Sequence, residues 1–397
     1  MSLLFSMNQR IKGYLIHSSL FLVTFITTTL AGAEWTHGKQ IIFITTDGIL
    51  YNANYSWQDF LSGLPYASCF LMILTAHEFG HYFTAMYYRV KVTLPYYIPL
   101  PPIGFLFGTL GALIRIKSPI RSTKENFDIG IAGPLAGFVV AFGFLLYGFT
   151  HLPPPEYIFQ FHPDYQQFGL DYAAHVYTPA FMPEGTVDVV IGKNLLFLFF
   201  EKFIADPSRV PNVHEIIHYP FLFAGFLSLI FTSINLLPVG QLDGGHVLYG
   251  LVGFKWHRII ASVLFIAFIF YAGLGYIKPT ESANALMLSI PLFIGFLFFA
   301  LKGLGLSLRD TVLAALSIFT VQYLLASIFP TLKGYEGWLL FAFILGRFIG
   351  VQHPPSEIEH PLSQGRVILG WIALVIFVLC FAPEPIALVQ FAKPIAP

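Results

Sequence analysis

The sequence is poor in charged residues and in cysteine. Asp, Glu, Lys and Arg make up 11% of the 397 residues, and the formal net charge is zero. No excess of positive charge therefore indicates a nucleic-acid partner. Cys69 and Cys380 both lie in apolar runs, which excludes a disulfide framework. The chain instead contains 56% hydrophobic residues, including 43 phenylalanines, and this composition is typical of a helical membrane protein with several spans.

Nine apolar runs are long enough, or nearly long enough, to cross a bilayer, which takes about 20 residues. They lie at 12–33, 65–88, 127–150, 219–254, 258–277, 284–301, 311–329, 336–350 and 366–382. The fourth run is too long for one span and contains Pro238 and Gly240, so we expect a broken helix there. The run at 336–350 is marginal. The sequence therefore predicts an all-α polytopic integral membrane protein with eight or nine transmembrane helices.

The distribution of Lys and Arg predicts the orientation of these spans. With the N-terminus inside, 14 of the 21 basic residues lie on the inner side and 7 on the outer side. The first run also resembles a signal peptide that ends at Ala31-Gly32-Ala33, but its length favours a retained anchor. We expect three parts, which are an N-terminal anchor and outer loop (1–60), a catalytic membrane core (61–256) with an outer insertion at 151–218, and C-terminal transmembrane helices (257–397).

Small residues and an amphipathic stretch predict two packing features. Gly133 and Gly137 in the third run have GxxxG spacing, with further small residues beside them. Such a stripe lets two transmembrane helices approach closely, so we expect a packing role without chemistry. Within the outer insertion, 191–204 is amphipathic and is predicted to form a helix that lies on the membrane surface.

The motif that carries chemistry is His77-Glu78-Phe79-Gly80-His81, in the middle of an apolar run. On a helix the two histidines lie one turn apart on the same face, where they can bind one Zn²⁺. Glu78 between them can take a proton from a metal-bound water. Because such a cluster is costly inside hydrocarbon, it predicts a functional site.

A second copy of the motif, His214-Glu215-Ile216-Ile217-His218, lies between Pro211 and Pro220. A proline two residues beyond the motif argues against a helix that continues in the same phase. We therefore interpret the second copy as interfacial histidines at a junction between a loop and a helix.

A catalytic zinc ion usually has three protein ligands, and Asp243 is the best candidate for the third. It is the only carboxylate in the run at 219–254. His81 lies eight residues from Arg89 and Asp243 lies twelve residues from Lys255, so both are predicted at a similar depth, roughly 12–18 Å from the inner surface. A helical span would separate His218 from Asp243 by roughly 30 Å or more. The predicted ligands are therefore His77, His81 and Asp243.

At these residues the chain resembles the site-2 protease family of intramembrane zinc metalloproteases. It is most similar to the branch shared by bacteria and plastids, which carries a second motif like the one at 235–246, Asn-Leu-Leu-Pro-Val-Gly-Gln-Leu-Asp-Gly-Gly-His. The resemblance covers about 60–385 and includes Gln352-His353-Pro354-Pro355. It implies zinc ligation by the three predicted residues and Glu78 as general base. It also implies that Asn235 lies near the substrate backbone. No PDZ-like domain is evident in the sequence.

The segment 98–117 predicts a small re-entrant β element. From Gly108 to Lys117 its residues alternate between two faces, and the resemblance implies a β-hairpin on the catalytic side. A substrate helix must be unwound before cleavage, and an added strand keeps its backbone groups bonded. We expect Gly108, Gly111 and Leu113 to contact substrate there. The alternative is an interfacial loop held by its prolines.

The function predicted from these observations is intramembrane cleavage of transmembrane or membrane-anchored proteins, or of signal peptides, by zinc-activated water. The alternatives are a metal-ion carrier or channel that uses the same His and Asp cluster, and a catalytically silent relative that binds membrane helices. The expected cofactor is Zn²⁺, and the expected partners are the substrate and membrane lipid, without nucleic acid. The expected location is a bacterial inner membrane, with the active site toward the cytoplasm. The sequence does not predict the oligomeric state.

Overall fold

The computed structural model describes residues 2–45, 48–103, 106–182 and 186–391, which form two compact units. The first unit comprises Met1–Pro119, Ala132–Thr232 and Val378–Pro397. The second comprises Ile120–Ile131 and Ser233–Phe377. Each is described separately below, and three elements (α4, α7 and α12) have residues in both.

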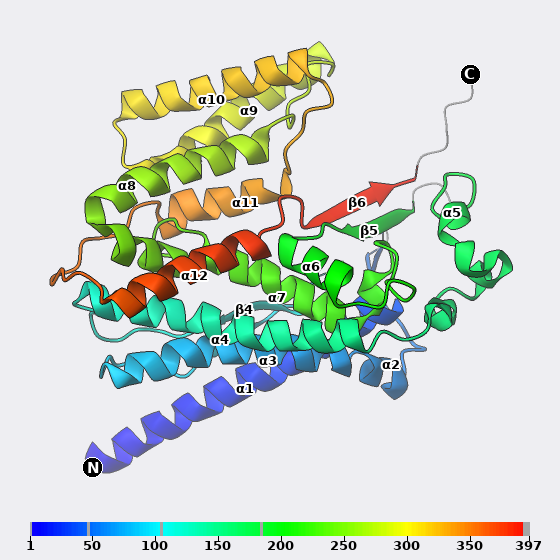
Figure 1. Cartoon of the computed structure of the whole chain (residues 1–397), viewed down its shortest axis with the longest axis horizontal. Coiled ribbons are helices and arrows are strands. Elements are labelled where there is room, and N and C mark those ends of the chain that lie inside the picture. Colours follow the sequence, from blue (N-terminus) through cyan, green and yellow to red (C-terminus); the bar gives the residue numbers. More distant parts are fainter. Residues whose placement is uncertain (1, 46–47, 104–105, 183–185, 392–397) are drawn as a thin grey trace. The chain divides into compact units, whose positions relative to one another are not determined.

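The first unit contains the N-terminal helices, three short sheets and the insertion (Figure 1). Its elements are α1 (Ser2–His37), β1 (Ile42–Thr45), β2 (Gly48–Tyr51), α2 (Trp57–Ser62), α3 (Leu64–Tyr87), β3 (Tyr96–Pro99), β4 (Thr109–Leu113), most of α4 (Thr123–Thr150), η1 (Pro155–Gln160), η2 (Pro163–Asp171), α5 (Ala173–Val176), β5 (Val187–Ile191), α6 (Leu195–Phe203), η3 (Ile216–His218), most of α7 (Pro220–Leu236) and β6 (Ile386–Gln390).

In the described part of the chain, three two-stranded antiparallel sheets pair β1 with β2, β3 with β4, and β5 with β6. The hairpin of β3 and β4 confirms the β element predicted at 98–117. The strand β6 pairs along the whole of β5, from Val187 opposite Gln390 to Ile191 opposite Ile386. A segment that follows the last helix therefore completes a sheet of the insertion.

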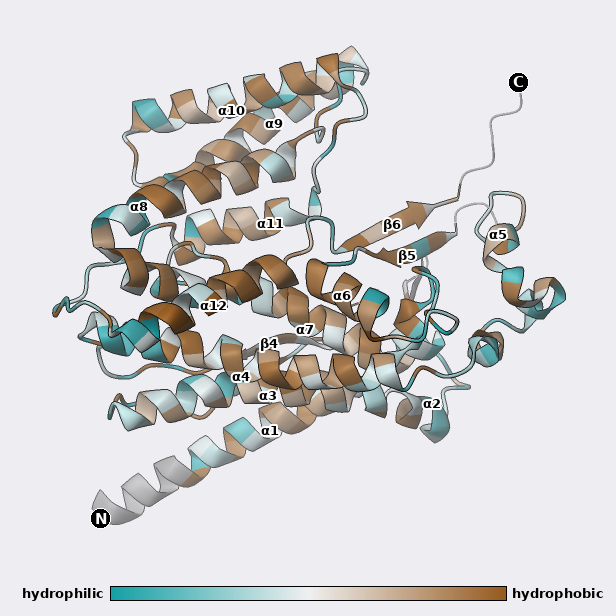
Figure 2. Cartoon of the chain, viewed as in Figure 1, coloured by the Kyte–Doolittle hydropathy of each residue, from teal (hydrophilic) through white to brown (hydrophobic). Residues whose placement is uncertain are grey.

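The insertion at 151–218 has a small hydrophobic core of its own. Ile158, Tyr165, Tyr172 and Val176 are buried against one another, with further aromatic residues packed around them. The helix predicted within 191–204 is α6, whose first turn is capped by Asn194. Figure 2 shows hydrophilic colour over much of the segment that leads into α5, in contrast to the hydrophobic colour of α7. The insertion is therefore a structured element and not an irregular loop.

The second unit is helical and contains α8 (Asp243–Gly273), α9 (Ala283–Leu301), η4 (Lys302–Leu304), α10 (Leu308–Ile328), α11 (Gly337–Ile344), η5 (Leu345–Ile349) and most of α12 (Gln364–Cys380). Within it, α9 packs against α10, and α11 packs against α8 (Figure 1). Ser282 and Ser307 cap the first turns of α9 and α10. Buried apolar side chains such as Phe265 and Phe293 fill the spaces between these helices.

Among the residues that the structure describes, five helices are long and apolar enough to cross a membrane. They are Ile11–His37, Thr123–Thr150, Asp243–Gly273, Ala283–Leu304 and Leu308–Ile328. Three shorter apolar helices are Pro220–Leu236, Gly337–Ile349 and Gln364–Cys380. The prediction of a mostly helical protein with helices long and apolar enough to span a membrane is thus confirmed, whereas the count of eight or nine stays a prediction.

The break predicted in the run at 219–254 lies between α7 and α8, where 237–242 are not helical. Gly240 has a φ of +63° in this turn, which favours glycine. The sequence also separated the runs at 219–254 and 258–277, and α8 is kinked at that boundary. Gly253 has a φ of +75° and a ψ of 172°, which are not helical values, so α8 consists of two helical stretches that meet there. The cations Lys255 and Arg258 follow the kink directly.

Candidate metal centre on α3

The first motif lies on α3, the 24-residue helix from Leu64 to Tyr87. Because helical residues four apart share a face, His77 and His81 point to the same side. Their Nε2 atoms are 3.1 Å apart and the ring planes are inclined at 76°. Both side chains are buried, with 8% of each residue exposed.

This pair of nitrogens fits a zinc ion. Two ligands of a tetrahedral zinc ion, at bond lengths of about 2.0–2.1 Å, lie roughly 3.3 Å from each other. The distance of 3.1 Å between the two Nε2 atoms is close to that value. Glu78 is also buried, and its Oε1 lies 4.0 Å from Nε2 of His77. A carboxylate is therefore held beside the nitrogens, at a distance that suits proton transfer through a water molecule.

The glycines of the GxxxG pair, on α4, pack directly against the motif histidines. A Cβ atom on Gly133 would lie 2.1 Å from Nε2 of His81, and one on Gly137 would lie 3.1 Å from Cβ of His77. In the opposite direction, a Cβ atom on Gly80 would meet the carbonyl oxygen of Ala132 at 2.5 Å. The packing role predicted from the spacing is therefore present, and the glycines pack against the imidazole rings of the motif.

The hairpin of β3 and β4 is tied to α3 close to the motif. The hydroxyl groups of Thr75 and Tyr97 are hydrogen-bonded at 2.7 Å, two residues before His77 in the helix. Leu113 is 47% exposed on β4, and Gly111 has a φ of +106°. One edge of β4 pairs with β3 in a two-stranded sheet.

The helix α1 packs along this hairpin, which the sequence did not predict. The Oγ1 of Thr27 donates a hydrogen bond of 2.7 Å to the carbonyl oxygen of Gly108, and Nδ1 of His17 donates one of 3.0 Å to the carbonyl oxygen of Pro95. Gly108 is buried, and a Cβ atom there would lie 2.4 Å from Cα of Thr28. Gly108 therefore helps to hold the hairpin against α1.

Asn235 and Asp243 lie in the second unit, on either side of the turn between α7 and α8. Asn235 is in the last turn of α7, and Asp243 is the first residue of α8. Cβ atoms on Gly244 and Gly245 would lie 2.0 Å and 2.2 Å from backbone oxygens of the preceding segment. The two glycines thus let the chain fold back tightly at Asp243.

A histidine that sequence reasoning assigned no role lies near this turn. Nε2 of His353 is 2.8 Å from Nδ1 of His246, and His353 is 3% exposed. The ring of His353 stacks on Tyr249, whose hydroxyl donates a hydrogen bond of 2.6 Å to Glu359. His353 belongs to the Gln-His-Pro-Pro segment that forms part of the family resemblance in the sequence. That segment was the signal by which a role for His353 could have been predicted. The structure shows it orienting His246 within the second unit.

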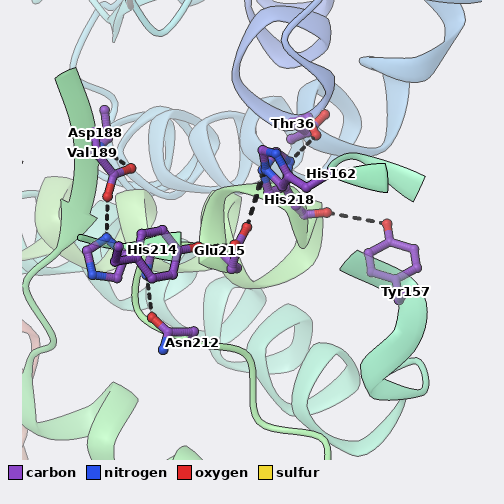
Figure 3. Close-up of polar contacts among 10 residues, drawn as sticks. Thr36, Tyr157, His162, Asp188, Val189, Asn212, His214, Glu215 and His218 are labelled. Carbon is purple, nitrogen blue, oxygen red and sulfur yellow. Dashed lines mark hydrogen bonds and ion pairs between the residues drawn. The ribbon is translucent and has the colours of Figure 1, made fainter. Parts of the chain in front are cut away.

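The second copy of the motif is not a helix. Residues 213–215 form a turn and Ile216–His218 a 3₁₀ helix, which confirms the predicted junction between a loop and a helix. His214 and His218 therefore do not share a face. Figure 3 shows His214 directed at Asp188, with Glu215 and His218 turned toward His162.

Burial shifts the pKa values of this second group. It lowers the pKa of His218 to about 4 and, as its largest effect, also lowers the pKa of His162. It raises the pKa of Glu215 to about 7, because a buried carboxylate is more stable in its neutral form. The imidazoles of His162 and His218 are consequently neutral at pH 7, which is the form that binds metals.

Comparison with known proteins identifies the family. The family model described as Peptidase family M50 matches residues 65–277, more than half of the chain. The chain is 31% identical over 192 residues to "Probable zinc metalloprotease EGY1, chloroplastic" of Oryza sativa subsp. japonica, covering 48% of this chain and 28% of that protein. It is 31% identical over 196 residues to the protein of the same name from Arabidopsis thaliana, covering 48% and 30%.

The chain is 24% identical over 259 residues to a more distant relative, "Probable zinc metallopeptidase EGY3, chloroplastic" of Arabidopsis thaliana. This match covers 63% of the chain and 39% of that protein. The chain thus spans well under half the length of the curated relatives it matches. No solved structure matches it. Since the matched region contains the motif on α3 and the turn before α8, the resemblance seen in the sequence is confirmed, and the chain belongs to peptidase family M50.

Proposed function

We propose that the chain is an intramembrane zinc metalloendopeptidase. The observation that carries the proposal is the pair of buried imidazoles on α3, whose Nε2 atoms face each other at 3.1 Å, with Glu78 beside them. The region matched by the family model contains all three residues. The relatives bear the name zinc metalloprotease or metallopeptidase, which supports both the metal and the reaction class.

The proposed zinc ligands are His77, His81 and Asp243. The position of Asp243 supports its inclusion, because it follows a tight glycine turn that breaks a long apolar run. A carboxylate in such a run is costly unless a cation compensates it. Bound zinc would supply Lewis acidity, which acidifies a water molecule and polarises the scissile carbonyl.

Glu78 is the proposed general base and acid. It would accept a proton from the attacking water and deliver it to the leaving amine. Its burial keeps the carboxylate close to the reacting groups and limits exchange with bulk water. Asn235 is the proposed contact to the substrate backbone, as the family resemblance implies, because its side-chain amide can both donate and accept hydrogen bonds.

The proposed substrates are transmembrane or membrane-anchored proteins, including signal peptides. A substrate helix must unwind before its carbonyls are accessible, and its backbone groups then need new partners. The outer edge of β4 is the proposed site of strand addition. The hydrogen bond between Thr75 and Tyr97 would keep such a strand near the motif on α3.

Leu113→Ala tests the strand-addition proposal. Cross-strand side-chain contacts contribute about 0.2–1 kcal/mol, so we expect KM for a single-span substrate to rise by up to about 5-fold with kcat and zinc content unchanged. Steady-state cleavage in detergent micelles measures both constants. Leu388→Ala is the matched control, because Leu388 is 68% exposed on β6, in a different sheet. Equal KM values for the two variants would contradict a substrate strand at β4.

The proposed topology is that of a multi-pass membrane protein with eight or nine spans. Its three proposed parts are those predicted from the sequence, namely 1–60, 61–256 and 257–397. The distribution of Lys and Arg supports an active site toward the inner surface. A bacterial inner membrane was expected from the sequence, whereas the names of the relatives describe them as chloroplastic. Lipid and a protein substrate are the proposed partners.

Reconstitution into lipid vesicles with a panel of single-span peptides tests the proposed function. We expect cleavage within or next to the span, mapped by mass spectrometry. A zinc chelator should abolish cleavage, and added zinc should restore it, because the metal is required for the reaction. Zinc flux across the vesicles without any cleavage would instead support the carrier and overturn the proposal.

A further inference from the structure

Three side chains of the insertion and its junction with α7 converge in a cluster that the proposed function does not use. Nε2 of His162 lies 3.1 Å from Nε2 of His218 and 3.6 Å from Oε2 of Glu215. Nε2 of His218 lies 3.5 Å from the same oxygen. Three potential metal ligands therefore form a nearly equilateral triangle (Figure 3).

The size of this triangle is that of a zinc site. Ligand atoms of a tetrahedral zinc ion lie roughly 3.3 Å apart, given bonds of about 2.0–2.1 Å. The three observed distances, from 3.1 to 3.6 Å, bracket this value. Two imidazole nitrogens and one carboxylate oxygen also form a donor set that zinc commonly uses.

The surrounding residues orient the donors toward the centre of the cluster. Nδ1 of His218 donates a hydrogen bond of 2.7 Å to the carbonyl oxygen of Thr36, at the end of α1, so the lone pair of Nε2 faces the cluster. The hydroxyl of Tyr177 donates to Oε1 of Glu215, which leaves Oε2 for the cluster. Such outer hydrogen bonds are typical of metal ligands, because they set the tautomer and the direction of each donor atom.

Burial shows which side of the cluster is accessible. The side chain of Glu215 is 2% exposed and that of His218 is 10% exposed, whereas that of His162 is 33% exposed. A carboxylate buried to this degree is costly without a compensating charge, and a divalent cation supplies it. A water molecule, as fourth ligand, would approach from the exposed side at His162.

We propose that His162, Glu215 and His218 bind a second zinc ion, separate from the centre on α3. The ion would join three parts of the first unit, namely the link between η1 and η2, the turn before α7 and, through the Thr36 carbonyl, the end of α1. Because Glu215 serves as a ligand, it is not available as a general base. The second site therefore stabilises the insertion and does not repeat the chemistry of the first.

The same motif provides a matched control. Nδ1 of His214 is hydrogen-bonded to Oδ2 of Asp188, and the His214 ring stacks on Tyr177 with the ring centroids 3.9 Å apart. His214 is thus a motif histidine held away from the triangle. His162→Gln and His214→Gln each replace one imidazole of the insertion, but only the first removes a proposed ligand.

Zinc content of the purified full-length protein, measured by inductively coupled plasma mass spectrometry, tests the proposal. We expect about two equivalents per chain in the wild type and in His214→Gln, and about one equivalent in His162→Gln and in Glu215→Gln. His77→Ala should also retain about one equivalent, and His77→Ala with His162→Gln should retain almost none. Because His162 is partly exposed, its replacement by glutamine should leave the fold intact, and thermal unfolding after gel filtration checks this.

The X-ray absorption spectrum of zinc in the His77→Ala variant identifies the ligands of the second site directly. This variant leaves all residues of the insertion unaltered. We expect nitrogen and oxygen ligands with the signature of two imidazoles. Equal zinc content in wild type and His162→Gln would overturn the proposal and leave the cluster as a hydrogen-bonded network only. Loss of zinc in His162→Gln but not in His77→Ala would support the second site and contradict the proposed centre on α3, so the two failures are distinguishable.

Discussion

Replacing Glu78 with glutamine should slow peptide cleavage by at least about 100-fold while leaving the zinc content unchanged. Glutamine has the size of glutamate but cannot accept a proton from the attacking water. General acid–base groups contribute about 10²–10⁴-fold to rates, so we expect kcat to fall by that factor, which is about 3–5 kcal/mol in the activation free energy. The cleavage rate of a reconstituted single-span peptide and the zinc content of the same preparation measure the two effects.

The control for this variant is Glu156→Gln. Glu156 is an exposed carboxylate in η1, so its replacement should leave both cleavage and zinc content as in the wild type. Wild-type cleavage by Glu78→Gln would refute its role as general base. Loss of zinc together with activity would instead identify Glu78 as a ligand, and the proposed ligand set would then be wrong.

Gly133→Ala should disable the proposed metal centre although it adds only a single methyl group on the neighbouring helix. Its Cβ atom would lie 2.1 Å from Nε2 of His81, well inside van der Waals contact, so the ring or the helix must move. A displacement of about 1 Å at a catalytic group can cost about 100-fold in rate. We expect a loss of at least that size in cleavage, together with a loss of zinc, measured on detergent-purified protein.

Two other glycines of α4 turn this prediction into a graded series. A Cβ atom on Gly137 would lie 3.1 Å from Cβ of His77, so Gly137→Ala should have an intermediate effect. No atom lies within 4 Å of a Cβ on Gly143, so Gly143→Ala should leave activity unchanged. Alanine favours helices over glycine by about 1 kcal/mol, and none of the three variants should unfold for lack of helix propensity. Similar activities of Gly133→Ala and Gly143→Ala would show that the close packing has no bearing on the site.

Local patterns in the sequence predicted the elements of the site. Spacing of four residues placed His77 and His81 on one face of α3, and Pro238 and Gly240 predicted the break before α8. Alternation at 108–117 predicted the hairpin, and Pro220 predicted that the second motif copy would not be helical. In each case residues close in the chain set the local conformation, so the signal was present in a short window.

Contacts between distant residues could not be predicted in this way. His17 and Pro95 are 78 residues apart, and His162 and His218 are 56 residues apart. No period or motif links such pairs, because their proximity depends on how whole helices pack. The second motif copy illustrates the difference, since His214 was a motif histidine and His162 was not, yet His162 completes the cluster.

The pairing of β5 with β6 restricts how the chain threads through a bilayer. Two strands that exchange backbone hydrogen bonds must be on the same side of the membrane, so the chain between Ile191 and Ile386 has to cross an even number of times. Six apolar helices of the described chain, α7 to α12, lie in that interval. The nine-residue α6 and the stretch of α8 before Gly253 are each too short to cross alone. We infer that α11, although short, crosses if the other five do, because its omission would leave β6 on the opposite side from the strand it pairs with.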